Sequence, residues 1–310
     1  MSDCQGNNET RIRAFLLLGL SNEYAVKQLL FGIFSLIYIF TTIGNITIII
    51  IVTVDSKLNS PMYFFLRNLS LTEIFYISVT VPRMLKDFLH HDNCISFIEC
   101  AIQLYFFCFL GTTECFTLGI MAYDRCVAIC SPLLYTSIMT KTLCLRFVIG
   151  SFLIAIFLSM GQITFVFSLP FCGPNTIDHY FCDLLPVVNL ICADTSTNEI
   201  TILLYGSLVI FTPFVLILIS YIKILAAVLS SSAEQSKAYS TCTSHLTSVI
   251  LFYGAAIITY LRTKPSYISK GDKILSLLYS VLIPMLNPLI YSLRNSQVKT
   301  AIKSLFKVKK

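Results

Sequence analysis

Charged residues divide this chain into long apolar runs. Four runs contain no acidic or basic side chain, a fifth holds only His245 as a titratable group of note, and two more carry one carboxylate near their middle. The runs are bounded by Lys27 and Asp55, Pro61 and Leu85 (around Glu73), Ile95 and Tyr123 (around Glu114), Arg146 and Asp178, Glu199 and Lys223, Lys237 and Arg262, and Lys273 and Arg294. Each can hold the roughly 20 apolar residues that a membrane-spanning helix needs. Because such continuous hydrophobicity is untypical of barrel strands, the pattern predicts an all-α membrane protein, a seven-transmembrane helix bundle.

Composition agrees with this prediction. Of the 310 residues, 56% are hydrophobic and 12% are charged, and the mean hydropathy is +0.79. A soluble domain has about 45–50% apolar and about 25% charged residues. No polar linker or low-complexity tract divides the chain. We therefore expect an extracellular segment (residues 1–27), one seven-transmembrane domain (residues 28–293) and a cytoplasmic helix and tail (residues 294–310).

The distribution of basic residues indicates an orientation. Five lysines follow Arg294, whereas Phe171–Glu199 contains no lysine or arginine, and this bias favours a cytoplasmic C-terminus. A glycosylation sequon at Asn8 suits an outer N-terminus. Several basic residues would then lie on the outer side and weigh against this orientation, because basic residues are usually enriched on the cytoplasmic side: Arg11, Arg13, Arg83, Lys86, Lys264 and Lys270. In the tail, a short amphipathic helix on the inner leaflet is predicted from an apolar face that comprises Val298, Ile302, Leu305 and Phe306.

Half of the twelve cysteines fall on the outer side in this arrangement. They are Cys4, Cys94, Cys100, Cys172, Cys182 and Cys192. The outer side is oxidising, so disulfides are expected there, although six cysteines allow 15 pairings and buried thiols are the alternative. The long acidic segment Phe171–Glu199 holds three of these cysteines at ten-residue spacing, which is typical of a folded cap.

Five segments of the chain resemble the signature segments of one family. They occur in the family's order and are PMYFFLRNLSLTE (Pro61–Glu73), MAYDRCVAICSPLLY (Met121–Tyr135), KAYSTCTSHL (Lys237–Leu246), LFYG (Leu251–Gly254) and PMLNPLIYSLRN (Pro284–Asn295). Together they are similar to vertebrate odorant receptors, which are rhodopsin-like G-protein-coupled receptors, and to the larger, terrestrial class of them. The chain departs from the family at Cys126, where a tyrosine is usual, and this puts the behaviour of the neighbouring residues in doubt.

The resemblance implies a receptor and not an enzyme. Its expected partners are a small volatile odorant, a heterotrimeric G protein of the stimulatory olfactory type that raises cAMP, membrane lipid and a receptor-trafficking accessory protein, with no nucleic acid. Its expected location is the plasma membrane of olfactory cilia. The resemblance also implies two disulfides, Cys100–Cys182 and Cys172–Cys192.

The adjacent pair Asp124–Arg125 ends the third apolar run. A solvated surface pair is the plain interpretation, but here the pair resembles the Asp-Arg-Tyr box of the receptor superfamily. The resemblance implies a latch, in which Asp124 holds Arg125 until activation releases the guanidinium. The other switch residues implied in this way are Tyr221, His245, Asn287, Pro288 and Tyr291.

Glu73 and Glu114 lie inside apolar runs, where an ionisable side chain is costly and usually functional. With Asn45 and Asn287 they resemble the polar centre, often a sodium site, of rhodopsin-like receptors. We hypothesise that this cluster changes its protonation or its Na⁺ occupancy on activation. The alternative is a structural hydrogen-bonded network. No other cofactor and no other metal site is expected.

The ligand is inferred by elimination. No acid lies between Glu99 and Glu114, so a cationic amine lacks a counter-ion in the third run, and no lysine lies between Lys273 and Arg294 to attach retinal. An apolar cavity for a small uncharged molecule remains. Positions that match the family's pocket are Phe107, Cys108, Gly111, Thr112, Tyr205, Val209, Tyr253, Ala256, Ile257 and Tyr260, with Leu277 and Ser280 as weaker candidates. Helix packing is the alternative role for each.

Other functional classes fit the sequence less well. A transporter would tend to show inverted repeats and paired broken helices, which are not apparent in this sequence. An intramembrane enzyme would need a nucleophile–base set or a metal motif, and neither HExxH nor GxSxG occurs.

Overall fold

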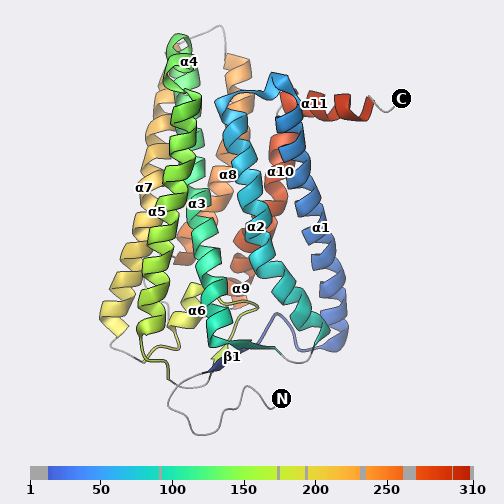
Figure 1. The fold of residues 1–310 in the computed structure, drawn as a ribbon, viewed down its shortest axis with the longest axis vertical. Helices are drawn as coiled ribbons and strands as arrows, with labels where there is room; N and C mark the ends of the chain where they lie inside the picture. Colours follow the sequence, from blue (N-terminus) through green and yellow to red (C-terminus); the bar gives the residue numbers. More distant parts are fainter. Residues whose placement is uncertain are drawn as a thin grey trace.

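The computed structural model describes residues 13–90, 93–172, 175–192, 195–230, 235–260, 270–294 and 296–307. Within these residues, long helices run side by side as a bundle (Figure 1). The long helices are α1 (Tyr24–Val54), α2 (Pro61–Leu89), α3 (Phe97–Cys130), α5 (Lys141–Ser168), α7 (Thr195–Ser230) and α8 (Gln235–Tyr260). A further rod consists of α9 (Lys270–Leu277), a π-helical segment η3 (Leu278–Leu282) and α10 (Ile283–Arg294). The prediction of a seven-helix membrane bundle is confirmed.

Six of these rods in the described residues are long and apolar enough to cross a membrane by composition alone, and α2 is the additional one. The charges of α2 lie near its ends or find partners. Arg83 pairs with Asp87 one turn away at 3.1 Å, and Arg67 lies over the ring of Phe64. Pro61 is the first residue of α2. An N–H at this position would have no acceptor within the helix, so proline removes no helical hydrogen bond here. Its charges therefore do not prevent α2 from crossing the bundle.

Helix α3 is the central rod. It packs against α2, α5, α7 and α8, and it is far more buried than the peripheral α1. Two proline-containing rods approach their neighbours at glycines. A Cβ added to Gly119 of α3 would lie 3.0 Å from Cβ of Pro213 in α7, and one added to Gly44 of α1 would lie 3.1 Å from Cβ of Pro288 in α10. Proline removes one helical hydrogen bond and so weakens its helix locally. At Pro213 and Pro288, the backbone of a neighbouring helix packs closely against this weakened position.

The end of the bundle that lies near the N-terminus carries a lid. We use this name for the strands β1 (Ala14–Leu17), β2 (Cys94–Ser96) and β3 (Thr176–Ile177) together with the short helix α6 (Leu184–Val188) and the loop around it. The sheet order is β2-β1-β3; β1 is antiparallel to β2, with Phe15 opposite Ile95, and parallel to β3, with Leu16 opposite Thr176. The disulfides Cys100–Cys182 and Cys172–Cys192 tie the lid loop to α3 and to itself.

Strand β1 was not anticipated from the sequence, where residues 1–27 were treated as one extracellular segment. Its Phe15 and Leu17 are fully buried. Phe15 stacks on Phe97 of α3 with ring centroids 5.9 Å apart and meets Phe171 edge-on at 5.8 Å. The strand is thus the middle strand of the lid's sheet. Cys94 is also disulfide-bonded, and Asn8 and Cys4 lie outside the described residues.

Polar contacts between described residues fasten the lid to the α9–η3 rod. Lys273 binds Asp178 at 2.6 Å, and His179 Nε2 lies 3.0 Å from the Ser276 hydroxyl. The hydroxyls of Tyr180 and Ser280 are 2.9 Å apart, and the Tyr279 hydroxyl donates to the buried carboxylate of Asp183. These contacts close one side of the lid.

The opposite end carries short elements and the tail helix; we call it the tail end. The short elements are η1 (Ser56–Leu58), η2 (Pro132–Leu134) and α4 (Tyr135–Ile138), and the tail helix is α11 (Ser296–Lys307). Helix α11 lies across the ends of α1 and α10 (Figure 1). It buries Val298 and Ala301, with Ile302 half-buried. The side chains of Leu305 and Phe306 lie outside the described residues.

The lid generates a pH prediction. Burial lowers the pKa of His179 from 6.5 to about 4. The unfolded chain therefore takes up a proton near pH 6.5 while the folded lid does not, so stability is full above pH 6.5 and falls by roughly 3 kcal/mol as the pH drops to about 4. Melting temperatures of purified wild type and His179→Gln, measured between pH 8 and pH 4, should diverge below pH 6.5. Glutamine keeps a donor for Ser276 but does not titrate, so parallel curves would contradict the assignment.

Candidate functional site

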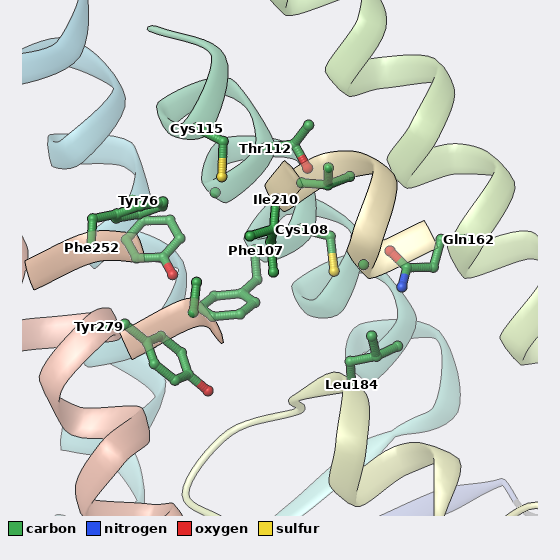
Figure 2. A pocket seen from close by; sticks show the side chains of 14 residues that line it. Tyr76, Phe107, Cys108, Thr112, Cys115, Gln162, Leu184, Ile210, Phe252 and Tyr279 are labelled. Carbon is green, nitrogen blue, oxygen red and sulfur yellow. The ribbon is translucent and has the colours of Figure 1, made fainter. Parts of the chain in front are cut away.

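A cavity of about 90 Å³ lies between the helices beneath the lid (Figure 2). Helices α2, α3, α5, α7, α8 and the η3 segment contribute its walls, and Leu184 of α6 covers it from the lid. The residues that line it are Tyr76, Phe107, Cys108, Gly111, Thr112, Cys115, Gln162, Leu184, Gly206, Val209, Ile210, Phe252, Ala256 and Tyr279. The cavity is therefore built by several helices that are far apart in the sequence.

Six of the positions predicted to contact a ligand line this cavity. Four come from α3 at helical spacing, because residues three to five apart share a face. The six are Phe107, Cys108, Gly111, Thr112, Val209 and Ala256. The structure thus gathers the α3 set in one place.

The other predicted positions are placed elsewhere. The Tyr205 hydroxyl packs against Gly161 of α5, where an added Cβ would be only 2.6 Å away. The Tyr253 hydroxyl donates to the Cys115 carbonyl at 2.9 Å, and Ile257 packs against the core. The weaker candidate Ser280 pairs with Tyr180, and Leu277 also packs against the core. The side chain of Tyr260 lies outside the described residues.

Eight lining residues were missed by the sequence analysis. Some were within reach of it: Cys115 lies seven residues after Cys108 on α3, Ile210 adjoins Val209, Gly206 is three residues before Val209, and Phe252 is four before Ala256. For the remaining four, the rotation of the helix or the folding of the lid decides whether the side chain faces the cavity. No local sequence pattern identifies them. They are Tyr76, Gln162, Leu184 and Tyr279.

The cavity is aromatic and uncharged. Tyr76 stacks on Phe107 at 5.0 Å between ring centroids, and Phe107 lies 5.9 Å from Tyr279. None of the described residues that line it is acidic or basic. An acid does lie behind the wall, because Asp183, 2% exposed, accepts hydrogen bonds from Tyr279 and from its neighbour's backbone N–H at 2.7 Å. The sequence analysis noted the absence of acidic residues only between Glu99 and Glu114 and did not consider this residue of the lid.

At the tail end, the latch pair is in contact. Arg125 donates to Asp124 through Nε at 3.1 Å and Nη2 at 2.5 Å, and Asp124 is fully buried. The other oxygen of Asp124 accepts a hydrogen bond from the Tyr135 hydroxyl of α4 at 2.8 Å. Burial beside this carboxylate raises the pKa of Tyr135, so the phenol stays a donor at neutral pH. Tyr135 was not predicted to take part, although it ends the same signature segment.

The other predicted switch residues lie nearby but do not bind Arg125. The Tyr221 hydroxyl is 2.8 Å from Nδ1 of His245, which is buried. Tyr291 is buried, and Pro288 packs against Gly44 as described above. Cys126, the departure from the family, packs with Ile224, Val228 and Cys242.

Between cavity and latch lies a buried polar centre. Glu73, Glu114, Asn45 and Asn287 are each no more than 1% exposed. The Asn287 amide donates to Glu73 at 2.5 Å, and the Asn45 amide donates to the carbonyl of Thr41. Four oxygens make no hydrogen bond within the described residues: both carboxyl oxygens of Glu114 and the side-chain carbonyls of Asn45 and Asn287. Oxygen donors without partners suit a hard monovalent cation or an added proton.

Comparisons with known proteins agree with this geometry. The family model described as "Olfactory receptor" matches residues 34–309. The chain is 48% identical to Olfactory receptor 10A7 and to Olfactory receptor 10C1, both from Homo sapiens, over 96% of its length and over 94% and 96% of theirs. The fold is similar to the crystal structure of squid rhodopsin, with a TM-score of 0.70 and 19% identity over 92% of this chain and 86% of that one.

The contact between Tyr135 and Asp124 yields a prediction about stability. Tyr135→Phe removes one donor from a buried carboxylate, which typically costs about 1.5–3 kcal/mol. The melting temperature of the purified protein should fall, and backbone amides of α4 should exchange faster. Tyr123→Phe is the matched control, because its ring contacts Phe147 on the neighbouring helix and no hydrogen bond joins its hydroxyl to Asp124 or Arg125 within the described residues. Equal melting temperatures for the two variants would show that Tyr135 does not hold Asp124.

Proposed function

Since the chain belongs to the olfactory receptor family, we propose that it binds a small, mostly apolar, uncharged odorant in the cavity beneath the lid and activates a stimulatory, olfactory-type G protein, which raises cAMP. Family membership makes it a multi-pass membrane receptor with an odorant ligand and a G-protein partner, and not an enzyme. The observation that carries the finer proposal is the uncharged aromatic cavity, which shares one helix with the latch.

Helix α3 supports the proposed coupling. Gly111 lines the cavity and Arg125 belongs to the latch, and a helix rises about 21 Å between these positions at ~1.5 Å per residue. The ligand and the output therefore occupy separate sites that one rod joins. An odorant shifts the balance between inactive and active forms only by binding the active form better.

In the proposed mechanism, the contact between Arg125 and Asp124 is the closed arrangement of the latch. Arg125 is satisfied by Asp124, while Tyr221 is engaged with His245. In the proposed activation, Arg125 leaves Asp124 and its guanidinium becomes available to the G protein and to Tyr221 or Tyr291. Pro213, Pro284 and Pro288 lie in the rods that would bend.

The polar centre is proposed to respond to this change. Glu73, Glu114, Asn45 and Asn287 would hold Na⁺ in the inactive form, because four of their oxygens are without partners. The cation would supply positive charge that keeps both carboxylates ionised. Protonation of Glu114 would instead remove one of the two negative charges without an ion.

We also propose the orientation that the basic residues favour. The lid end and residues 1–27 would face outward, with glycosylation at Asn8, and the receptor domain would span residues 28–293. Residues 294–310 would be cytoplasmic, with α11 on the inner leaflet. The proposed location is the plasma membrane of olfactory cilia, reached with a trafficking accessory protein.

The proposal is tested with a cAMP reporter in cells that express the full chain and are screened against a diverse odorant panel. Arg125→Ala should abolish the odorant response at unchanged surface level, because the released guanidinium is the proposed contact for the G protein. Arg146→Ala, an exposed arginine near the start of α5, should respond like wild type. Normal signalling by surface-expressed Arg125→Ala would overturn the latch mechanism, and a chain silent to every odorant would contradict the proposed receptor function.

The polar centre is tested by the sodium dependence of basal nucleotide exchange in membranes. In wild type, basal exchange should fall several-fold as Na⁺ replaces choline, and Glu114→Gln should lose this dependence because a neutral amide binds a cation more weakly than a carboxylate. Glu99→Gln, at the exposed start of the same helix, is the control. If Glu73→Gln and Glu114→Gln leave basal and ligand-driven signalling unchanged, the centre has only a structural role.

A further inference from the structure

Some polar side chains that line the cavity have no hydrogen-bond partner in the part of the chain that the structure describes; besides the hydroxyl of Tyr76, they include Gln162 and Thr112. Gln162 of α5 is 8% exposed and Thr112 of α3 is 5% exposed, and both line the cavity. Figure 2 shows the Gln162 amide pointing from α5 into the space that Cys108 and Thr112 border from α3. The other residues of α3 that line the cavity are apolar or carry a thiol.

The threonine differs from its helical neighbours. Thr113 and Thr117 of the same helix each donate to the backbone carbonyl four residues earlier, at 2.8 Å. This local bond is the usual partner for a threonine hydroxyl within a helix. Thr112 does not make it, so its hydroxyl remains available to a molecule in the cavity.

A buried polar group without a partner costs about 1–3 kcal/mol, which gives a ligand that supplies one a selective advantage. The amide of Gln162 offers both donors and an acceptor, and the hydroxyl of Thr112 offers one of each kind. A ligand hydroxyl can donate and accept, so it satisfies both side chains. A ketone can only accept, and a hydrocarbon can do neither.

The charge of the cavity wall narrows the chemical class of the ligand further. The described lining residues carry no formal charge, so an ionised ligand would have to leave water without a counter-ion at the wall. The carboxylate of Asp183 lies one hydrogen bond behind Tyr279 of the lining, and its negative charge opposes an anionic ligand in particular. The cavity of about 90 Å³ also favours a compact molecule, because a cavity of ~150 Å³ holds benzene.

We propose that Gln162, together with Thr112, determines specificity by selecting a compact, neutral ligand that carries a hydroxyl group. The inference rests on the proposed function, since it names the ligand class of the same cavity. It assigns the polar recognition to α5 and α3.

The test measures binding directly, so that it does not depend on G-protein coupling. Purified full-length protein in lipid nanodiscs is melted with cyclohexanol, cyclohexanone, methylcyclohexane or cyclohexanecarboxylate, and affinities are obtained from the concentration dependence of the shift. Wild type should bind cyclohexanol about tenfold more tightly than methylcyclohexane, with cyclohexanone between them and no shift from the carboxylate.

Gln162→Leu and Thr112→Val should each bring the alcohol-to-hydrocarbon ratio toward one while binding of methylcyclohexane is kept or improved. Two variants are matched controls and should keep the ratio: Ser159→Ala, a buried polar residue one turn away on α5 outside the cavity, and Thr113→Val on α3.

Three results would overturn the inference. The first is a wild-type ratio near one, or no shift from any probe. The second is an unchanged ratio in Gln162→Leu with a lower ligand-free melting temperature, which would mean a packing role. The third is a Ser159→Ala variant that loses the ratio equally. A wild type that binds cyclohexanol selectively but gives no odorant response in cells would contradict the proposed signalling and leave this inference standing.

Discussion

The structure depends on one constraint, which is that a polar group inside hydrocarbon must find its partner within the protein. The long helices satisfy their own backbones, so the remaining polar side chains decide how the rods are rotated against one another. Asn287 of α10 meets Glu73 of α2, the Tyr253 hydroxyl of α8 meets the backbone of α3, and Tyr221 of α7 meets His245 of α8. Among the described groups left without such partners are Gln162 and Thr112 at the cavity and Glu114 in the polar centre, where a ligand or an ion would complete them.

This constraint also explains which parts of the molecule could be predicted from the sequence. The seven runs were visible because charges are excluded from hydrocarbon, and the α3 face of the cavity was expected from positions that match the pocket of the family that the chain resembles. Tyr76, Gln162 and Tyr279 could not be found, because the rotation of α2 and α5 and the π-helical segment η3 decide where they point. Tyr135 meets Asp124 across a chain reversal, and a strand of only four residues, β1, gives no periodic signal.

The lid connects these features at the cavity end. Asp178, His179, Tyr180 and Asp183 hold the α9–η3 rod, and the Cys100–Cys182 disulfide holds the same loop to α3. Tyr279 belongs both to this fastening and to the cavity wall. The rod that carries Asn287 and Pro288 toward the latch therefore contains a residue that borders the ligand space, which gives the proposed signal a second route beside α3.

Strand β1 has a practical consequence for work on this receptor. Epitope tags or leader sequences fused near the amino terminus are one way to follow surface expression. Here Phe15 sits in an aromatic cluster with Phe97 and Phe171, and Leu17 is fully buried. A fusion junction that replaces Ala14–Leu17 would remove the middle strand of the sheet, so reporters and leaders belong upstream of Ala14.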